Sequence, residues 1–406
     1  MTTRFRSLFL GFSLLAALFA IAGQRDLRAS EGPSNSNAYK QLSVFSYVLK
    51  YVDEDYVVDP NLSAVSNGAM HGLLESLDSE SSYLSAEENA KLAKLKEQPE
   101  GLGAALSKRA GYGYVLSINP GGPAEKAGLE SGDIIESING ASTHEIPLPL
   151  LRAMFRGAQG QVKLSVIRAR KAQPIKVTIT LGASHAGAVV YRMEAELSGY
   201  IKTNNLEPGR SAEIVAAVRA LQAQGAHRLI LDLRNCGSGD YAEAAAAANV
   251  FLNHGLISKL RGQTVAEQSF NAEASRQITN LPVAVLINRS TAGPAEVLAA
   301  AILENKRGEV VGEKSFGAAS QVNTIQLQDG SALALSVARY YTPSGKAILA
   351  DSPVTPDVLV EPSLEDYYIN ADGEAKDVTA NENKPAVDDV LKKAIETLKV
   401  KEAKAA

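Results

Sequence analysis

The sequence predicts a multidomain α+β protein, in which a helical N-terminal segment precedes a small domain of short strands and a larger α/β core domain. Three observations predict this architecture. Apolar residues recur at helical spacing between residues 39 and 95. Short apolar runs separated by glycine turns fill residues 100–183. Strands alternate with helical patterns over residues 188–362, the core domain, which is the order expected for βαβ units.

The composition describes a chain with ample apolar residues for a buried core. Its 406 residues are 45% hydrophobic and 21% charged, with a formal net charge of −4. A chain of this length holds about two to three domains. It has no basic excess, so we expect no nucleic-acid partner. Its single cysteine cannot form an internal disulfide, and its five histidines are scattered without metal-ligand spacing, so we expect neither a metal site nor a cofactor.

The N-terminus, residues 1–22, has the pattern of an export signal. Arg4 and Arg6 precede an apolar run of 14 residues, 8–21, which is short for a membrane-spanning helix. The run ends at Ala-Ile-Ala, residues 20–22, which fits a small-residue cleavage site. An uncleaved membrane anchor is the alternative interpretation. In both cases we expect the rest of the chain to be exported to the periplasm or cell envelope.

Two further segments flank the predicted domains. Residues 23–38 are rich in Gly, Ser and Asn and are predicted to be a linker before the helical region at 39–99. At the other end, residues 363–406 are charged, and an amphipathic helix is predicted over 387–400 with a frayed tail behind it. The residues that carry function are therefore expected between these flanks.

The stretch from residue 281 to 322 organises the rest of the chain. An apolar strand at 283–287 ends in a polar turn, 288–293, and Pro294 then opens a helix, where its fixed φ and missing N–H are tolerated. A second strand follows at 309–313, with a glycine turn behind it. A turn at a helix N-terminus presents free N–H groups that can stabilise an oxyanion. The sequence therefore indicates this turn as the place to look for a nucleophile.

This stretch resembles the C-terminal processing peptidases, also called tail-specific proteases. Their segment reads like VNxxSASASEI followed by GxxTFGKGxVQ. Glu296 and the Phe-Gly pair at 316–317 set the register. The Asp-Gly pair at 329–330 and the YYTPSG run at 340–345 support the register downstream, because they fall in the family's positions without a gap.

The resemblance implies a serine nucleophile, a lysine base and a glutamine that orients the lysine. The corresponding positions here are Gly293, Ala318 and Val322. Glycine has no nucleophilic atom and alanine cannot accept a proton, whereas a Ser–Lys dyad needs both groups and a lysine desolvated enough to be neutral. We therefore expect a non-catalytic member of the family. The same register predicts that Gly293 and Ala318 lie close together and that Ala318 is largely buried.

A relocated dyad is the alternative, and it would make the chain an active serine-type endopeptidase that cleaves near protein C-termini. Ser290 and Lys314 are 24 residues apart, which imitates the spacing of the family's pair. However, Ser290 falls in a turn or N-cap position, and Lys314 falls at a strand end where it is expected to point to solvent. A Cys236 nucleophile would need a neighbouring base, and His227 and His254 lie in surface-type positions.

Two more motifs of the core domain resemble the family. Gly-Tyr-Ile-Lys at 199–202 and LILDLRN at 229–235 match its GYIR and LILDLRxN motifs. The family continues with PGG and uses a glycine N–H there for its oxyanion hole, whereas this chain continues with Cys-Gly-Ser-Gly. The resemblance therefore places the oxyanion region at Gly237, Gly239 and Pro294.

Residues 100–183 resemble a PDZ domain, and we call them the PDZ-like domain. Residues 150–155 are expected in its second helix, beside the peptide groove. Leu102, Gly103 and Ala104 match the carboxylate-binding loop. In such a loop, successive backbone N–H groups hold a C-terminal carboxylate while the peptide adds as a strand. The alternative is a PDZ fold that binds only its own chain.

The resemblance spans residues 40–398 and includes the run GLLESLDSESSYL at 72–84, where Ser79 and Glu80 replace the family's usual Pro-His. It implies an exported PDZ-containing protein that binds protein or peptide C-termini, or other proteins. A regulatory subunit that assembles with an active paralogue is a further interpretation, and a homo-oligomer is also compatible with the sequence.

Overall fold

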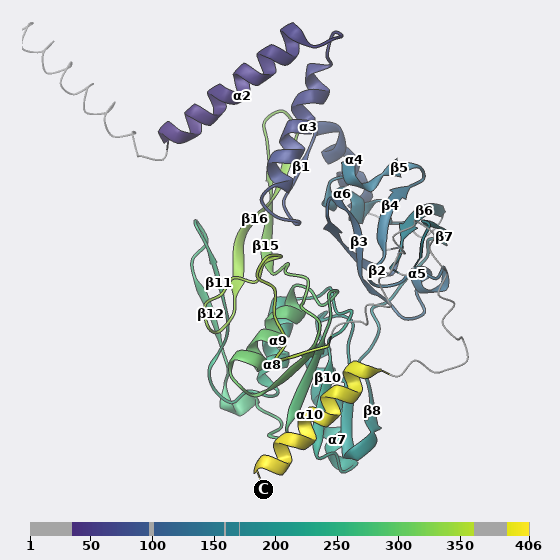
Figure 1. Cartoon of the computed structure of the whole chain (residues 1–406), viewed down its shortest axis with the longest axis vertical. Coiled ribbons are helices and arrows are strands. Elements are labelled where there is room, and N and C mark those ends of the chain that lie inside the picture. Colours follow the sequence, from purple (N-terminus) through teal and green to yellow (C-terminus); the bar gives the residue numbers. More distant parts are fainter. Residues whose placement is uncertain (1–34, 97–100, 158–159, 170, 361–387, 406) are drawn as a thin grey trace, which may run out of the picture. The chain divides into compact units, whose positions relative to one another are not determined.

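The computed structural model describes residues 35–96, 101–157, 160–169, 171–360 and 388–405 (Figure 1). The chain divides into two units, residues 1–68 and 69–406. The predicted export signal or anchor at 1–22 lies outside the described residues. None of the described helices is both long and apolar enough to span a bilayer.

The first unit contains helix α2, Asn35–Asp55, and the beginning of α3, Leu62–Glu75. Residues 35–38 are therefore helical, although the sequence placed them in a linker. Asn and Ser are only mildly unfavourable in helices, so the strong apolar pattern that follows extends the helix back through them. Large apolar side chains of α2, including Leu42 and Val48, are exposed within this chain.

A six-stranded sheet lies at the centre of the core domain, in the order β17-β14-β13-β10-β9-β8. Its strands are β8 (Val190–Glu194), β9 (Ser198–Lys202), β10 (Arg228–Asp232), β13 (Val283–Ile287), β14 (Gly308–Gly312) and β17 (Val358–Leu359). β8 is antiparallel to β9, and the other neighbours are parallel. Every residue of β10 and β13 is buried, as expected for parallel strands that are covered on both faces.

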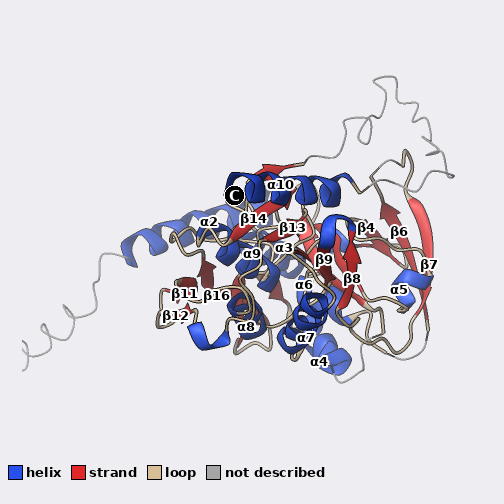
Figure 2. Cartoon of the chain, turned by 90° about the horizontal axis from the view of Figure 1, so that it is seen from below, coloured by secondary structure: helices blue, strands red, loops and turns tan. Residues whose placement is uncertain are grey.

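Helices cover both faces of this sheet (Figure 2). α7 (Arg210–Ala223), α8 (Tyr241–Asn249) and α9 (Pro294–Glu304) pack on one face. α10 (Asp389–Ala405) packs on the other through Ala394 and Leu398, against Tyr200 and Leu286 among others. α10 continues to Ala405, beyond the predicted end at residue 400, and residues 361–387 lie outside the described part of the chain.

A second, antiparallel sheet has the order β1-β16-β11-β12, with β15 paired to β16. Its strands are β1 (Ser82–Leu84), β11 (Leu256–Gly262), β12 (Gln268–Asn271), β15 (Ser320–Gln326) and β16 (Ala332–Tyr341). The sequence predicted only helix between residues 39 and 95, and β1 departs from that. Asp78 ends the helical pattern, because its carboxylate accepts hydrogen bonds from the backbone of Glu80 and Ser81, and helix resumes only at α4 (Ala86–Lys96).

The PDZ-like domain is a sheet in the order β2-β3-β4-β6-β7, with β5 paired to β4. Its elements are β2 (Ala104–Arg109), β3 (Tyr112–Ile118), α5 (Pro123–Lys126), β4 (Ile134–Ile138), β5 (Ala141–Ser142), α6 (Leu148–Ala153), β6 (Gln161–Ile167) and β7 (Ile175–Thr180). It has its own apolar core, which includes Val115, Ile135 and Leu151. β2 is an edge strand and lies beside α6. We call the space between β2 and α6 the peptide groove.

Candidate functional site

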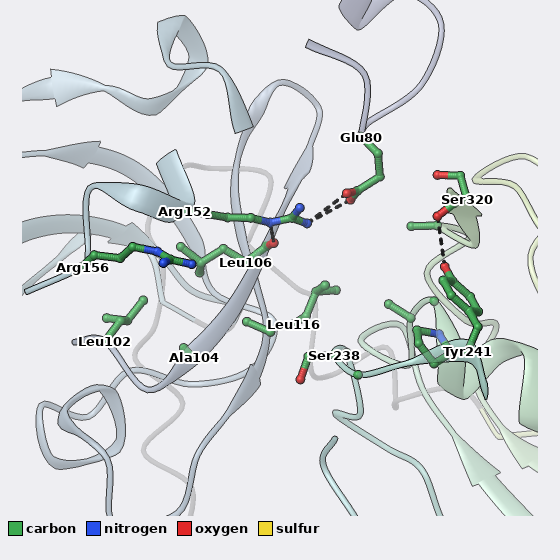
Figure 3. Close-up of a pocket in the computed structure, with 17 residues that line it drawn as sticks. Glu80, Leu102, Ala104, Leu106, Leu116, Arg152, Arg156, Ser238, Tyr241 and Ser320 are labelled. Atoms are coloured by element: carbon green, nitrogen blue, oxygen red, sulfur yellow. Dashed lines mark hydrogen bonds and ion pairs between the residues drawn. The ribbon is translucent and has the colours of Figure 1, made fainter. Parts of the chain in front are cut away.

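A cavity of about 420 Å³ lies where the PDZ-like domain meets the core domain, and we call it the central cavity (Figure 3). Its core-domain wall consists of mostly small residues: Gly237, Ser238, Gly239, Tyr241, Ala292, Gly293, Pro294, Ala318 and Ser320. The opposite wall comes from the PDZ-like domain, with Glu80 beside it: Leu102, Ala104, Ala105, Leu106, Leu116, Arg152 and Arg156. Two of the three predicted catalytic positions, Gly293 and Ala318, therefore line this cavity.

Gly293 forms the turn between β13 and α9, with φ 58° and ψ −116°. This backbone conformation is one that residues with a Cβ atom rarely adopt. A Cβ atom at this position would lie 3.4 Å from the Tyr241 hydroxyl and 3.5 Å from the Ala318 carbonyl oxygen. Positions 293 and 318 are therefore close neighbours, but neither carries a group that can attack a carbonyl or accept a proton.

Glu296 holds the two halves of the site together from a fully buried position. Its Oε2 accepts hydrogen bonds from the Gly293 amide at 2.8 Å and from the Ala318 amide at 2.9 Å. Its Oε1 accepts from the Gly317 amide at 2.7 Å and from the Ser315 hydroxyl at 2.5 Å. Burial raises the pKa of Glu296, and these hydrogen bonds oppose that rise. One carboxyl group thus caps α9 and anchors the facing turn.

Two positions differ from what the sequence predicted. Ala318 is only partly buried, because it borders the central cavity instead of the solid core. Val322 is 38% exposed and is not among the residues that line the central cavity. The reason is that β15 leaves the core at this point, and each of its residues 322–326 is exposed. A side chain at position 322 therefore contributes nothing to the cavity in this structure.

The predicted oxyanion region is assembled, but part of it lacks donors. Gly237, Gly239 and Pro294 all line the central cavity. Proline has no N–H, and the Gly293 amide already donates to Glu296, so the start of α9 offers no N–H at these two positions. The loop at 237–239 is the part of the region that could still donate hydrogen bonds.

The PDZ-like domain covers this loop directly. A Cβ atom on Gly237 would lie 2.4 Å from Cβ of Leu116, so only glycine permits this contact. The register of β2 against β3 steps from Ala105–Ser117 to Leu106–Val115, which makes Leu116 the extra residue of a β-bulge. A bulge redirects a side chain, and here it directs Leu116 onto the core domain.

Ser290 and Lys314, the candidates for a relocated dyad, lie in different environments. Ser290 is buried, and its Oγ lies 3.1 Å from the hydroxyl of Tyr114 on β3. The Tyr114 ring stacks on Phe316, with 5.4 Å between ring centroids. Lys314 is exposed. Ser290 therefore contributes to the contact between the PDZ-like domain and the core domain.

Cys236 is fully buried. Burial, together with the negative charge of Asp232, raises the pKa of its thiol well above the usual value, so it stays protonated at neutral pH. His227 and His254 are both exposed. Among the residues that the structure describes, no cluster of three or more His, Cys, Asp or Glu side chains is arranged to hold a metal ion.

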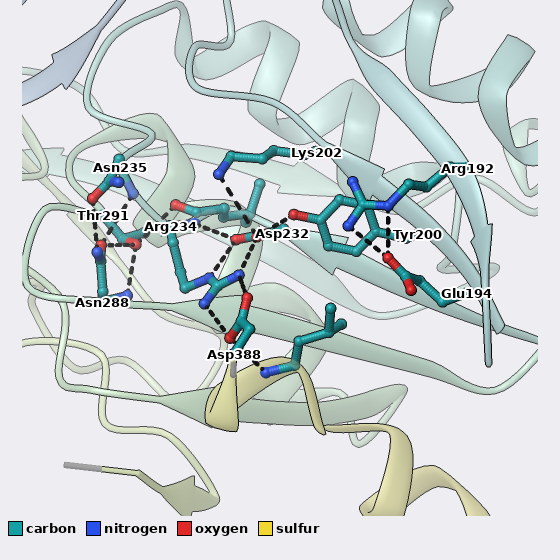
Figure 4. Close-up of polar contacts among 12 residues, drawn as sticks. Arg192, Glu194, Tyr200, Lys202, Asp232, Arg234, Asn235, Asn288, Thr291 and Asp388 are labelled. Carbon is teal, nitrogen blue, oxygen red and sulfur yellow. Dashed lines mark hydrogen bonds and ion pairs between the residues drawn. The ribbon is translucent and has the colours of Figure 1, made fainter. Parts of the chain in front are cut away.

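A second polar network lies at the carboxyl end of β10 (Figure 4). Asp232 is fully buried and accepts hydrogen bonds from the Tyr200 hydroxyl at 2.6 Å and from Arg234 at 2.6 and 2.9 Å. Arg234 also donates to both carboxylate oxygens of Asp388, at 2.7 and 2.8 Å. Asp388 directly precedes α10, so the network joins α10 to the strand end that leads into the 237–239 loop.

Asparagine pairs fix the two turns relative to each other. The backbone N–H of Asn235 donates to Oδ1 of Asn288 at 3.1 Å, and the side-chain Nδ2 of Asn288 donates to Oδ1 of Asn235 at 2.7 Å. The Thr291 hydroxyl donates to the Leu233 carbonyl at 2.9 Å. The turn after β10 and the turn after β13 therefore keep their positions without any catalytic side chain between them.

The predicted carboxylate-binding loop opens on the same cavity. Leu102 and Ala104 line the central cavity, and Gly103 between them has φ 72°, a left-handed conformation that glycine adopts readily. The loop leads directly into the edge strand β2. The peptide groove and the Gly293–Ala318 pair are therefore parts of one continuous space.

The sequence analysis missed several polar residues of this cavity, among them Glu80, Arg152 and Tyr241. Burial and the charge of Glu296 raise the pKa of Tyr241 well above its usual value, so its hydroxyl stays protonated and cannot act as a base. Two signals were present in the sequence. Glu80 departs from the family motif, and Arg152 falls in the helix expected beside the groove.

Two family models match this chain. Residues 198–360 match peptidase family S41, and residues 91–167 match the PDZ domain. The second match agrees with the resemblance of residues 100–183 to that domain.

Several relatives are similar over most of the chain. A carboxy-terminal-processing protease of Bartonella bacilliformis is 31% identical over 342 residues, which cover 82% of this chain and 78% of the relative. The carboxy-terminal processing protease CtpA of Bacillus subtilis is 30% identical over 385 residues, or 92% of this chain and 79% of the relative. A solved photosystem II D1 C-terminal processing protease superposes with a TM-score of 0.63 at 25% identity, covering 79% of this chain and 94% of that one. This chain therefore belongs to the carboxy-terminal processing proteases of peptidase family S41.

Proposed function

We propose that this protein is a non-catalytic member of its family that binds the C-terminal segments of other proteins in the central cavity. The observation that carries the proposal is the contrast between the two cavity walls. Gly293 and Ala318 occupy the positions of nucleophile and base, and neither has a reactive group. The opposite wall presents the cationic side chains of Arg152 and Arg156. This arrangement supports binding and lacks the groups for acyl transfer.

The groove has the features that strand addition requires. β2 is an edge strand, and an extended peptide can pair with its outer edge. The loop at 102–104 places backbone N–H groups at one end of that edge, where a terminal carboxylate would accept charge-assisted hydrogen bonds. Arg156 lines the same cavity and adds positive charge. The favoured ligand is therefore an extended chain with a free, apolar C-terminus.

Peptide binding tests this function. A fluorescein-labelled ten-residue peptide that ends in alanine with a free carboxylate should bind with Kd of about 10–100 μM, which corresponds to roughly 5–7 kcal/mol. Its C-terminally amidated twin should bind more weakly, because the amide removes the charge that the loop recognises. Fluorescence anisotropy measures both. Equal affinity for the two peptides would refute the carboxylate loop.

The alternative of an active endopeptidase with a relocated dyad has less support. Ser290 is buried beneath Tyr114, whereas Lys314 is exposed. A lysine acts as a general base when burial lowers its pKa, and an exposed lysine lacks that desolvation.

A second candidate function is regulation of an active paralogue, or self-association, through the first unit. The observation that favours it is the exposed apolar surface of α2, which includes Leu42, Tyr47, Val48 and Tyr51. Exposed apolar side chains in this number are typical of association surfaces. Light scattering of the purified chain, alone and mixed with an active paralogue, would show whether either complex forms. Polar substitution at Leu42 and Val48 should then dissociate it.

Export to the periplasm or cell envelope also remains a proposal, and the support is the pattern of residues 1–22. Cell fractionation combined with N-terminal sequencing of the recovered protein tests it. A mature N-terminus at residue 23 would indicate a cleaved signal, and an intact N-terminus in the membrane fraction would indicate an anchor.

A further inference from the structure

Arg152 reaches across the peptide groove from α6 to β2 (Figure 3). Its Nε donates a hydrogen bond to the Leu106 carbonyl at 2.8 Å. Its Nη2 donates to Glu80, at 3.0 Å from Oε2 and 3.2 Å from Oε1. The guanidinium group therefore links a backbone acceptor of the edge strand to the carboxylate of Glu80.

The Leu106 carbonyl is an acceptor that an added peptide strand would use. β2 lies at the edge of its sheet, and this carbonyl bonds to α6 instead of β3, so it faces the groove. In antiparallel pairing, every second residue of a strand turns its N–H and C=O toward the same neighbour. If the loop at 102–104 holds the terminal carboxylate of a ligand peptide, the last residue of that peptide pairs with Ala104. The peptide residue two positions before the last one then pairs with Leu106.

Glu80 is itself held in place by contacts with both β2 and the core domain. Its Oε1 accepts a hydrogen bond from the Ser107 hydroxyl at 2.8 Å, and its backbone amide donates to Asp78 at 3.1 Å. Asp78 accepts from the Ser336 hydroxyl of β16 at 3.1 Å. The Glu80 side chain is only 14% exposed. Arg152 is therefore held by the Leu106 carbonyl and by a carboxylate that is itself anchored.

We propose that Arg152, held by Glu80, caps the strand-addition edge of the groove, so that a peptide must displace Arg152 in order to pair with the Leu106 carbonyl. This inference rests on the proposed peptide-binding function and describes how that site is regulated. When the peptide displaces Arg152, the Leu106 carbonyl loses one hydrogen bond and gains another. The backbone N–H of the ligand replaces Nε of Arg152 at the Leu106 carbonyl, and Arg152 keeps its bonds to Glu80 or finds solvent.

The cap has consequences for the ligand. A chain that offers no backbone N–H at the third residue from its end gains nothing from displacing Arg152. The cap therefore weakens the affinity of every peptide that does supply this donor by the strength of the bond that is displaced, and it reduces the advantage of such a peptide over one that lacks the donor. A hydrogen bond that involves a charged donor changes an equilibrium by about fivefold to tenfold when its partner is partly exposed to water.

Two substitutions test the cap, with the labelled acid and amide peptides described above as probes and the whole purified chain as the protein. Arg152→Leu removes the donor and keeps an apolar stem, so the acid peptide should bind about fivefold more tightly than to the wild type. Glu80→Gln keeps a partner for Ser107 but weakens the hold on Arg152, so we expect a gain of about twofold. Arg219→Leu, an exposed site on α7, makes the same charge change away from the groove and should leave the affinity unchanged. Thermal melting of each variant establishes that it is folded.

An ester analogue of the acid peptide gives a sharper readout. In this analogue, an ester oxygen replaces the backbone N–H of the residue two positions before the C-terminal residue. The analogue therefore cannot donate a hydrogen bond to the Leu106 carbonyl. The replacement should weaken binding to Arg152→Leu by about fivefold and binding to the wild type by less than about twofold, because Arg152 keeps its bond when the ester peptide binds. Equal losses in the two proteins would overturn the proposal.

The outcomes separate this inference from the peptide-binding function. If the wild type prefers the acid peptide and Arg152→Leu binds it no more tightly, the cap is refuted and the function stands. If Arg152→Leu binds the acid peptide measurably and the wild type does not, both the cap and the peptide-binding function are supported. If neither protein binds it, the groove is not a peptide site and both fail.

Discussion

Two regions at the carboxyl ends of β10 and β13 have opposite chemistry. The network around Asp232 consists of Tyr200, Arg234 and Asp388, and the described contacts satisfy each of these side chains. The cavity wall that follows β13, the strand next to β10, offers Gly293 and Ala318, whose side chains have no functional group. The chain has therefore kept the polar contacts that hold the fold and lacks those that the family resemblance assigns to bond cleavage.

The comparison shows why an empty site can keep its shape. Glu296 ties the Gly293 turn to the Ala318 turn through backbone amides, which are present whatever the side chains at those positions. The pairing of Asn235 with Asn288 does the same for the loop after β10. Neither device depends on a serine or a lysine. The cavity wall at Gly293 and Ala318 is therefore held in position by backbone contacts that do not depend on the side chains at these two positions.

The largest effect is expected at the intact network. Asp232→Asn should lower the free energy of unfolding by about 3 kcal/mol, because it removes the charge that pairs with Arg234 in a buried setting. Urea unfolding followed by circular dichroism measures this change. Asp351→Asn, at an exposed site, makes the same chemical change and should shift the free energy by less than about 0.5 kcal/mol. If Asp232→Asn lowered the free energy of unfolding no more than Asp351→Asn does, the network would not stabilise the fold.

A smaller effect is expected at the anchor of the empty site. Glu296→Gln should cost about 2 kcal/mol, because one carboxylate oxygen becomes an NH₂ group that faces backbone donors. Ala318→Ser, at the cavity itself, should change the free energy of unfolding by less than about 0.5 kcal/mol. Chemical denaturation of both variants tests the contrast. If Ala318→Ser proved the more damaging of the two, the backbone anchoring described above would be wrong.

The smallest effect concerns the contact between Arg234 and α10. Burial tends to raise the pKa of Asp388, but the hydrogen bonds and charge of Arg234 lower it below its usual value. A depressed folded-state pKa contributes stability above the unfolded value of about 3.9, and this contribution is lost as the pH falls through the folded value. Asp388→Asn should therefore be less stable than the wild type by about 1 kcal/mol at pH 7.

The pH dependence checks the sign of that effect. The difference between the wild type and Asp388→Asn should begin to close as the pH falls below about 4, where Asp388 of the unfolded chain takes up a proton. It should be gone once the pH lies below the lower folded-state pKa, because Asp388 is then neutral in both states. Thermal melting at several pH values measures it. A difference that grows toward low pH would contradict the assignment of the charge to Asp388.

The sequence predicted the elements around the site well, because their signals are local. The apolar run of β13, the proline at the start of α9 and the register set by Glu296 are enough to bring Gly293 and Ala318 together. The family matches bear out the α+β architecture with a PDZ domain and an S41 core.

The remaining features depend on contacts between distant segments, which periodicity does not report. The bulge that turns Leu116 onto Gly237 arises from the pairing of β2 with β3. The bridge from Arg152 to Leu106 and Glu80 joins three separate segments. Val322 was placed by motif alignment alone, and the departure of β15 from the core could be seen only in the fold.

The central claim, a site that binds without cleaving, is tested most directly by a hydrolysis assay. The purified chain is incubated with an unstructured protein that has an apolar C-terminus, and mass spectrometry follows the products. Because Gly293 and Ala318 stand at the family's nucleophile and base positions, we predict no cleavage above that in buffer, and the same for Ser290→Ala. Removal of such groups commonly lowers the rate by about 10⁴-fold or more. Robust cleavage that disappears in Ser290→Ala would contradict the account and establish a relocated nucleophile.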